Sequence, residues 1–234
     1  MFWAYFDETI VNVVDLGNQQ AQPTEMFVGG CIASQEQWEK FTRAWTKSLA
    51  KAFHAREFYQ FRGEFRWLTK SGKPDFRRHG RFRDKLADII VEYADELIVF
   101  TSMTPIRHKG TRKAYEDAAM RALWDFTKYS PEQRDSLYVI LARHPELSPW
   151  SILRKFEALD WEGRLAGCGI FQPNEVPPLQ AADFVLHSLN KRWKGLETAS
   201  FNRLKEGCLR LNKQFRQQIA SSLDAEKLLA RVPP

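Results

Sequence analysis

The order of strand-like and helix-like segments constrains the fold of this chain most strongly. Short apolar runs, typical of strands covered on both faces, alternate with longer segments in which apolar residues recur at helical spacing. The first two strand-like segments follow one another, which favours an antiparallel start, whereas helical segments separate the later ones, which favours parallel crossovers. The sequence therefore predicts an α/β fold with a mixed central sheet and helices on both faces.

The expected strands and helices follow from the length and periodicity of each segment. The strand-like segments are residues 2–6, 26–34, 96–103, 136–142 and 163–171. The helical segments are residues 38–52, 84–93, 112–127, 150–159 and 177–193. With 234 residues, of which 44% are hydrophobic, the chain can bury one large core, and we expect a single domain over residues 1–234.

Residues 61–85 differ from the rest of the chain, with nine Lys or Arg against three acids and several interleaved aromatic residues. We interpret them as a basic aromatic insertion, for which two explanations stay open. Either the cations bind backbone phosphates while Trp67, Phe76 or Phe82 stack on bases, or the aromatic residues anchor an irregular segment whose charges stay in water. In the first explanation the nucleic-acid-binding cations are Arg62, Arg66, Lys73, Arg77, Arg78, Arg81 and Arg83.

Charge, cysteine content and hydropathy narrow the class of protein a little further. The 35 Lys and Arg against 29 Asp and Glu give a net charge of +6, which suits a nucleic-acid partner but also many other proteins. Three isolated cysteines without CxxC spacing argue against a disulfide framework or a zinc knuckle. Because no apolar run approaches the roughly 20 residues of a membrane helix, and the N-terminus does not resemble a signal peptide, we expect a cytoplasmic protein without a membrane partner. The sequence does not indicate an oligomeric state.

Two carboxylates occur where the sequence otherwise predicts buried structure. Asp7 and Glu8 come directly after the first apolar run, and a charge near a core is costly unless it is paired or binds a metal. Side chains alternate along a strand, so we expect Asp7 to share a face with Tyr5 and Glu8 to share the face of Phe6. Taken alone, an Asp at a strand end is more often a turn or cap residue than a ligand.

Two further segments combine acids with imidazoles. His54 and Glu57 follow the first expected helix, where a solvated local ion pair is an equally good explanation. On the last expected helix, the spacing of Gln180, Asp183 and His187 predicts one polar stripe. The alternatives are an acid favoured by the helix N-terminus and an imidazole that is hydrogen-bonded at the edge of the core.

Four segments, in their order along the chain, resemble the motifs of the domain of unknown function 3800 family: "AYFDETI", "FVGGCIAS", "FHAREF" and "PPLQAADFVLHSL". The set covers nearly the whole chain, and the last segment is the most specific. This family is similar to the ribonuclease H-like superfamily, in which acids on the first strand and on a later helix converge on divalent metal ions beside the sheet. The resemblance therefore implies a ribonuclease H-like fold.

Together with the basic stretch, the acidic motifs favour an activity, that of a metal-dependent nuclease or related phosphodiester hydrolase acting on RNA or DNA. Carried over by position, the implied catalytic residues are Asp7, Glu8, His54, Glu57 and Asp183. Three of these, Asp7, Glu8 and Asp183, are the implied ligands of Mg²⁺ or Mn²⁺, which are hard ions that prefer carboxylate oxygen. The resemblance also assigns Gln180 and His187 to the lining of the same site.

The chain departs from the family pattern in two places. Thr9 stands where the family more often has Ser, a change that keeps the hydroxyl. Related folds often carry another acid at the end of a middle strand, whereas this chain has Ala142, Arg143 and His144 there, with Glu146 shortly after. Two other functions therefore stay open: a non-catalytic nucleic-acid or protein-binding module that keeps the fold, and a metal-dependent hydrolase of a small phosphorylated substrate.

Overall fold

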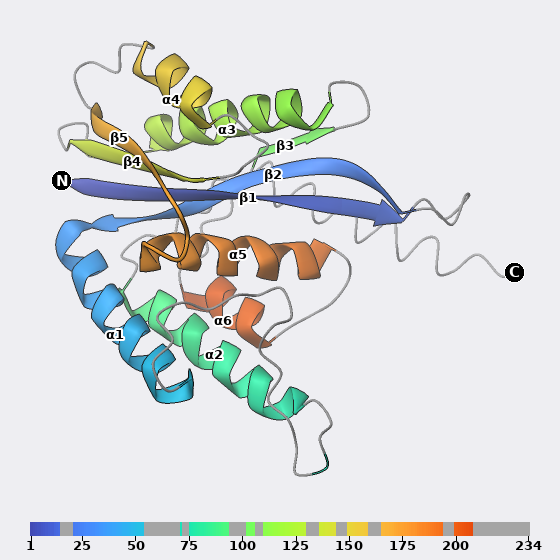
Figure 1. Cartoon of the computed structure of the whole chain (residues 1–234), viewed down its shortest axis with the longest axis vertical. Coiled ribbons are helices and arrows are strands. Elements are labelled where there is room, and N and C mark those ends of the chain that lie inside the picture. Colours follow the sequence, from blue (N-terminus) through green and yellow to red (C-terminus); the bar gives the residue numbers. More distant parts are fainter. Residues whose placement is uncertain are drawn as a thin grey trace, which may run out of the picture.

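A five-stranded mixed β-sheet lies between two layers of helices (Figure 1). This arrangement is seen in a computed structural model that describes residues 1–14, 21–53, 71, 75–93, 102–105, 110–129, 136–143, 149–158, 165–193 and 199–207. Within these ranges the strands and helices follow one another in the expected order, with one further helix near the end. The predicted α/β class, with a mixed sheet and helices on both faces, is confirmed.

The strands are paired in the order β3-β2-β1-β4-β5. At the centre, β1 (Phe2–Val14) is antiparallel to β2 (Ala21–Ser34) and parallel to β4 (Leu137–Ala142). At the edges, β3 (Ser102–Pro105) is antiparallel to β2, and β5 (Leu165–Phe171) is parallel to β4. The antiparallel start and the later parallel crossovers are both present.

The helices form one layer on each face of the sheet. The layer on the Tyr5 face of β1 consists of α1 (Gln35–Phe53), α2 (Phe76–Tyr93), α5 (Pro177–Trp193) and α6 (Ala199–Gly207). The layer on the Phe6 face consists of α3 (Gly110–Tyr129) and α4 (Pro149–Glu157). Two buried apolar clusters result, because alternate side chains of each strand pack against different helices.

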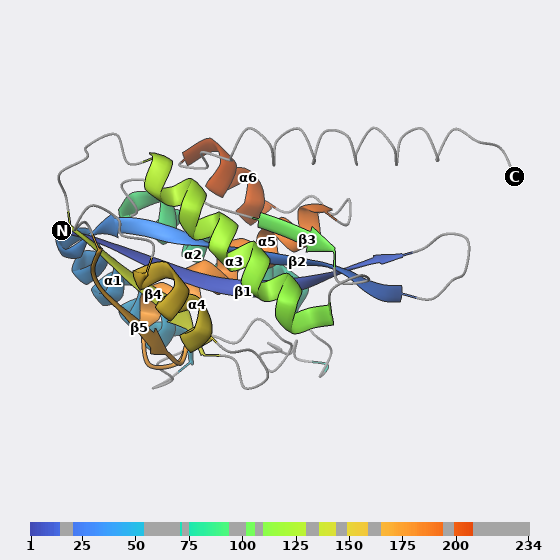
Figure 2. The ribbon, with the colours of Figure 1, turned by 90° about the horizontal axis from the view of Figure 1, so that it is seen from above.

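The first strand is longer than the apolar run that predicted it, and this changes the position of the acids. The sequence suggested that the strand ends at Asp7, but pairing with β2 continues through Asp7 and Glu8 to Val14. In Figure 2, β1 and β2 run side by side and continue past the end of α3. The second half of β1 is rich in β-branched residues, which favour extended backbone, and β2 supplies its backbone hydrogen bonds. The acids therefore lie in the middle of a strand, and the prediction that they end it is wrong.

The second helix begins at Phe76, within the stretch interpreted as an irregular insertion. Asp75 supplies an N-cap, since its Oδ1 accepts a 2.9 Å hydrogen bond from the backbone N–H of Arg78. Residues 76–85 therefore belong to a regular helix that starts earlier than the expected residues 84–93. Residues 61–70 and 72–74 of the predicted insertion lie outside the described ranges.

Two expectations concern the chain as a whole. In the ranges given above, no helix combines the length and the hydropathy of a membrane-spanning segment. The assignment of residues 1–234 to a single domain stays a prediction.

Candidate functional site

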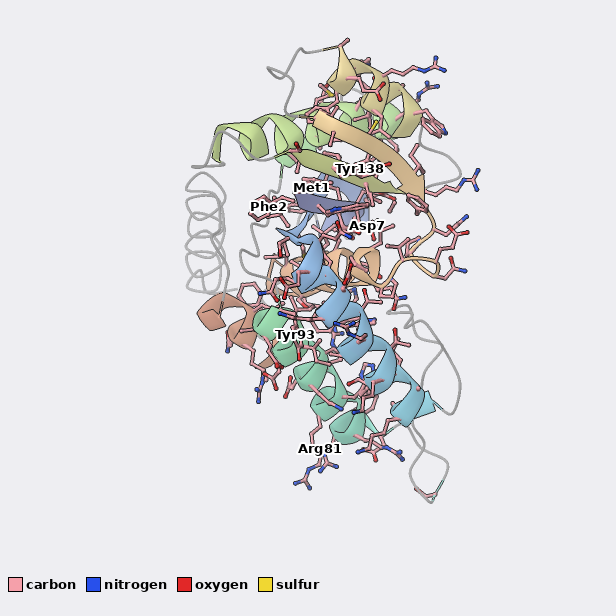
Figure 3. All side chains as sticks on the ribbon, turned by 90° about the vertical axis from the view of Figure 1, so that its left-hand side faces the viewer. Met1, Phe2, Asp7, Arg81, Tyr93 and Tyr138 are labelled. Atoms are coloured by element: carbon pink, nitrogen blue, oxygen red, sulfur yellow. The ribbon has the colours of Figure 1, made fainter. Side chains whose placement is uncertain are left out.

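Asp7 lies in the middle of β1, on the face of the sheet that carries Tyr5, at the boundary between the strands and the larger helical layer (Figure 3). The side chain is 8% exposed, and its Oδ1 accepts a 2.8 Å hydrogen bond from the backbone N–H of Glu8. A carboxylate at this depth raises the free energy of the fold unless a nearby cation compensates its charge.

The last helix of the predicted motifs, α5, brings Asp183 to the same face. Prolines at its start fix the first helical turn, and Ala181 and Ala182, both 0% exposed, let its backbone approach the sheet closely. Further along α5, the side-chain amide of Asn190 donates a 3.4 Å hydrogen bond to Thr9 Oγ1 of β1. Asp183 is therefore held on the side of α5 that faces β1.

Neighbouring negative charges raise the pKa values of groups around Asp7. The pKa of Asp7 is raised well above its ordinary value, first by burial and then by the negative charges of Glu8 and Asp183. The pKa of Tyr115, on α3, is raised first by burial and then by Glu8 and Asp7. The structure thus brings Glu8 and Asp183 within electrostatic range of Asp7, with Tyr115 on the far side of the sheet.

The side chains of the polar stripe predicted on α5 face two different neighbouring elements. Gln180 is 2% exposed, and its Oε1 accepts a 2.9 Å hydrogen bond from the indole N–H of Trp45 in α1. His187 is partly buried and lies one turn beyond Asp183 on the side of α5 that faces β1. The stripe therefore fixes α5 to α1 through Gln180 and faces the sheet through Asp183 and His187.

Two residues near the acids were not among the predicted site residues. Asn190 continues the stripe by another turn, and its i+7 spacing from Asp183 was a usable sequence signal. Tyr115 had no such signal, because only the packing of α3 against the opposite face of β1 brings it near Glu8.

The end of β4 lies beside Asp7. Phe6 pairs with Leu141, so Ala142 is the next neighbour along the parallel ladder, and it packs in the same cluster as Tyr5. Ala142 is 2% exposed, and the exposed Arg143 that follows donates its backbone N–H to the carbonyl of Phe171 at 2.8 Å. Among the described residues, β4 therefore places no acid next to Asp7.

The cations of α2 lie on two faces of the helix. Arg77, Arg78 and Arg81 are exposed, and Figure 3 shows Arg81 at the outer end of α2, well away from Asp7 and directed away from the sheet. Arg83 is 5% exposed and lies against α5, with its guanidinium 3.4 Å from Ser188 Oγ. The prediction that groups Arg83 with the surface cations is wrong, because the inner face of α2 turns it into the core.

The aromatic residues of the same stretch also differ in exposure. Phe76 is 77% exposed at the start of α2, beside the exposed arginines, whereas Phe82 is 9% exposed and packs in the core. Other predicted site residues lie outside the described ranges: His54, Glu57, Arg62, Arg66, Trp67 and Lys73. His144 and Glu146, which follow β4, lie outside them as well.

The donor chemistry of the acids fits a divalent cation. Carboxylate oxygens are the ligands that Mg²⁺ and Mn²⁺ prefer, and a cation offsets both the burial and the repulsion by Glu8 and Asp183 that raise the pKa of Asp7. In the part of the chain that the structure describes, however, no group of three or more His, Cys, Asp or Glu side chains is gathered closely enough to hold a metal ion. The acids therefore have the donor chemistry of a divalent-cation site, but the described residues do not gather the three or more ligands that would complete it.

Two comparisons with known proteins found no relative of this chain. No family model matches the chain, and a search of curated proteins found no match. The resemblance to the domain of unknown function 3800 family therefore stays a prediction from the sequence motifs.

Proposed function

We propose that this chain is a ribonuclease H-like, metal-dependent nuclease or related phosphodiester hydrolase. The observation that carries the proposal is the meeting of Asp7, on the first strand, with Asp183, on the late helix, closely enough for each charge to be felt by the other. These are two of the three positions at which the resemblance implies metal-binding acids. Buried like charges destabilise a fold, and such local conflicts are typical of functional sites.

The roles of the acids follow from their positions. Asp7 and Asp183 would hold Mg²⁺ or Mn²⁺ through carboxylate oxygens, whereas Glu8, which strand alternation directs to the Phe6 face, adds negative charge beside Asp7. When bound, the ion supplies an activated water and stabilises negative charge on the phosphate. The hydrogen bond from the Glu8 N–H orients the carboxylate of Asp7, and the bonds of Asn190 and Gln180 fix α5 against β1 and α1.

An exposed cationic face on α2 supports RNA or DNA as the substrate. It consists of Arg77, Arg78 and Arg81, and the exposed ring of Phe76 lies at its start. Cations neutralise backbone phosphates, and an exposed aromatic ring offers a surface on which a base stacks. This face lies away from Asp7, so a bound strand would extend along the helical layer to reach the acids.

The test of the proposed function is cleavage of labelled RNA and DNA under single-turnover conditions. We expect wild-type protein to cleave one of them in Mn²⁺ or Mg²⁺, and EDTA to stop the reaction. Asp183→Asn is expected to lower the rate by about 100-fold or more, because loss of a direct ligand exceeds the roughly 10–100-fold effect of residues that only orient ligands. Glu36→Gln, an exposed change on α1, is the control. Equal cleavage by Asp183→Asn and wild type contradicts the proposal.

The cationic face of α2 predicts a change in salt dependence. Replacing Arg77, Arg78 and Arg81 by Gln is expected to lower the slope of log affinity against log salt by about one for each phosphate that the arginines neutralise. Fluorescence anisotropy with a labelled oligonucleotide in EDTA measures this slope. The matched control replaces three exposed cations of the other helical layer, Arg112, Lys113 and Arg154, by Gln. A slope that stays unchanged shows that the arginines of α2 only interact with water.

The position next to Asp7 allows a direct test of the incomplete ligand set. Ala142→Asp places a third acid on the same face, and without metal it is expected to lower the free energy of unfolding by about 1–3 kcal/mol. Saturating Mn²⁺ is expected to restore most of this loss, because the new carboxylate completes the site. Ala142→Asn, which has the same shape without the charge, is the control. Thermal unfolding with and without Mn²⁺ measures both effects, and a loss that Mn²⁺ leaves unchanged contradicts the expectation.

A non-catalytic nucleic-acid-binding module is the second candidate, and the presence of Ala142 beside Asp7 favours it. It shares the cationic face of α2 but does not use the acids. This candidate predicts tight binding to RNA or DNA that neither EDTA nor Asp183→Asn changes, together with no cleavage by wild type.

A further inference from the structure

The strand β5 carries an exposed aromatic ring on the same face of the sheet as Asp7. Among the described strands, β5 lies at one edge of the sheet (Figure 1), and its last residue, Phe171, is 40% exposed. Phe171 pairs with Ala142 of β4, which is the neighbour of Asp7, so the three residues form one row across three strands. Neighbouring strands lie about 4.8 Å apart, which places the backbone of Phe171 about 10 Å from that of Asp7. The ring is the point at which this row reaches solvent.

The ring of Phe171 is held against its own strand. A Cβ atom at Gly169, which lies two residues earlier on the same face, would be 2.8 Å from Cε2 of the ring, so glycine leaves the space that the ring occupies. The turn after the strand is closed by two hydrogen bonds. The backbone N–H of Gln172 donates to the carboxylate of Glu175 at 2.8 Å, and the backbone N–H of Glu175 donates to the carbonyl of Gln172 at 2.9 Å. The glycine and the closed turn together position the ring.

The helical layers bury the two faces of β5 unequally. Leu165, Cys168 and Ile170 pack in the apolar cluster of the Phe6 face, together with residues of α4. In the part of the chain that the structure describes, no residue of β5 belongs to the apolar cluster of the Tyr5 face. Burial in the core therefore does not account for an aromatic side chain at Phe171.

A cation lies next to the ring. Arg143 follows Ala142 at the end of β4 and is exposed, and its backbone N–H donates a 2.8 Å hydrogen bond to the carbonyl of Phe171. The cation is thus attached to the backbone beside the ring. An aromatic surface next to a guanidinium has the chemistry of a nucleotide site, because the ring stacks on a base and the guanidinium binds a phosphate.

Position and charge also favour an anionic ligand. Ligands of open α/β sheets bind outside the carboxyl ends of the strands, which is where Phe171 and Arg143 lie. A second copy of this chain, with its net charge of +6, is a poorer match for a site that contains a cation. A nucleic-acid strand supplies both a base and phosphates.

We propose that Phe171 and Arg143 form a nucleotide-binding subsite at the carboxyl ends of β4 and β5, in which the ring stacks on a base and the guanidinium binds an adjoining phosphate of an RNA or DNA strand. The choice of a nucleic-acid strand rests on the proposed function, which assigns phosphodiester cleavage to the acids of the same row. One strand of B-form DNA advances about 3.4 Å per nucleotide, so the bound base lies about three nucleotides from Asp7.

The first test is the affinity of the full chain for a labelled single-stranded oligonucleotide, measured by fluorescence anisotropy in EDTA. Phe171→Leu keeps an apolar side chain and is expected to weaken binding by about fivefold or more, because base stacking is lost. Phe171→Trp is expected to bind at least as tightly as wild type. The matched control is Trp150→Leu, which removes an exposed aromatic residue from α4 and is expected to change the affinity by less than about twofold.

Three results of this test would overturn the subsite. They are absence of saturable binding by wild type, equal weakening by Phe171→Leu and Trp150→Leu, and a change in oligomeric state on Phe171→Leu with unchanged oligonucleotide affinity. The last result, measured by light scattering, would assign the ring to contact between copies of the chain.

Gly169→Ala tests whether the position of the ring matters. The added Cβ displaces the ring, so we expect weaker oligonucleotide binding in the wild-type background and no further weakening in the Phe171→Leu background. Equal weakening in both backgrounds would place the effect in the strand and contradict a positioned ring.

Arg143→Gln tests the phosphate contact and separates this inference from the proposed function. It is expected to lower the slope of log affinity against log salt by about one, whereas Arg154→Gln on α4 leaves the slope unchanged. Equal slopes for Arg143→Gln and wild type contradict the phosphate contact. Absence of cleavage by wild type counts against the nuclease but not against the subsite, because binding is measured in EDTA. Cleavage by wild type together with unchanged binding by Phe171→Leu overturns the subsite alone.

Discussion

Asp7→Asn is expected to raise the free energy of unfolding of the metal-free protein at neutral pH by about 1–3 kcal/mol. The reason is that the wild-type carboxylate is 8% exposed and lies near the charges of Glu8 and Asp183. Asparagine keeps the size of the side chain and the oxygen that accepts the Glu8 N–H, but it removes the charge. Chemical denaturation in EDTA measures the change.

Asp7→Asn is also expected to change how the free energy of unfolding depends on pH. A carboxyl group whose pKa is raised on folding binds its proton more tightly in the folded state, so its contribution to stability is lost as the pH rises. For Asp7 this loss begins near the ordinary pKa of 3.8 and continues through the raised value in the folded state. Wild type is expected to lose stability over this window, and Asp7→Asn to lose less.

Two comparisons make the Asp7 prediction specific. Asp88→Asn changes an acid that is 54% exposed and paired with Arg203, so no gain in stability is expected from it. Mn²⁺ is expected to stabilise wild type, by about 2.7 kcal/mol at 100 times its dissociation constant, but not Asp7→Asn. An Asp7→Asn protein that is less stable than wild type in EDTA at neutral pH contradicts the explanation given for the raised pKa.

Gly30→Ala is expected to destabilise the protein by about 3 kcal/mol or more. Gly30 pairs with Phe6 in the ladder of β1 and β2, next to the pair formed by Asp7 and Gly29. A Cβ atom at Gly30 would lie 2.7 Å from the carbonyl carbon of Tyr5 and 2.8 Å from the Cα of Phe6, and it would overlap the carbonyl oxygen of Tyr5. Because these are backbone atoms of a central strand, they cannot move aside without breaking the ladder.

Gly80→Ala is the matched control for this substitution. Gly80 lies on α2, where an added Cβ meets no atom within 4 Å, so alanine is expected to stabilise the helix by about 0.5–1 kcal/mol. Urea denaturation of both variants gives the comparison. Equal, small effects at the two glycines contradict the close approach of β1 and β2 beside the acids.

Local patterns predicted much of the fold, because the decisive information lies within single elements. Helical periodicity and apolar runs gave the order of helices and strands, and strand alternation gave the opposite faces of Tyr5 and Phe6, and with them of Asp7 and Glu8. Helical spacing on α5 also predicted that Asp183 and His187 share a side.

Features that depend on tertiary contacts were not predictable in this way. The apolar run Phe2–Phe6 marks only part of the first strand, although β-branched residues continue to Val14, and the pairing with β2 shows its full length. Arg83 belongs to a run of cations in the sequence, but the inner face of α2 buries it against α5. The position of Ala142 beside Asp7 follows from the register of a parallel ladder between segments far apart in the chain.

A crystal of the protein soaked in Mn²⁺, with anomalous scattering recorded at the manganese edge, tests the shared metal site of Asp7 and Asp183 most directly. We expect an anomalous peak between the two carboxylates, and loss of that peak in Asp7→Asn. Manganese bound only elsewhere on the protein, or a peak that Asp7→Asn leaves unchanged, would contradict the proposed site.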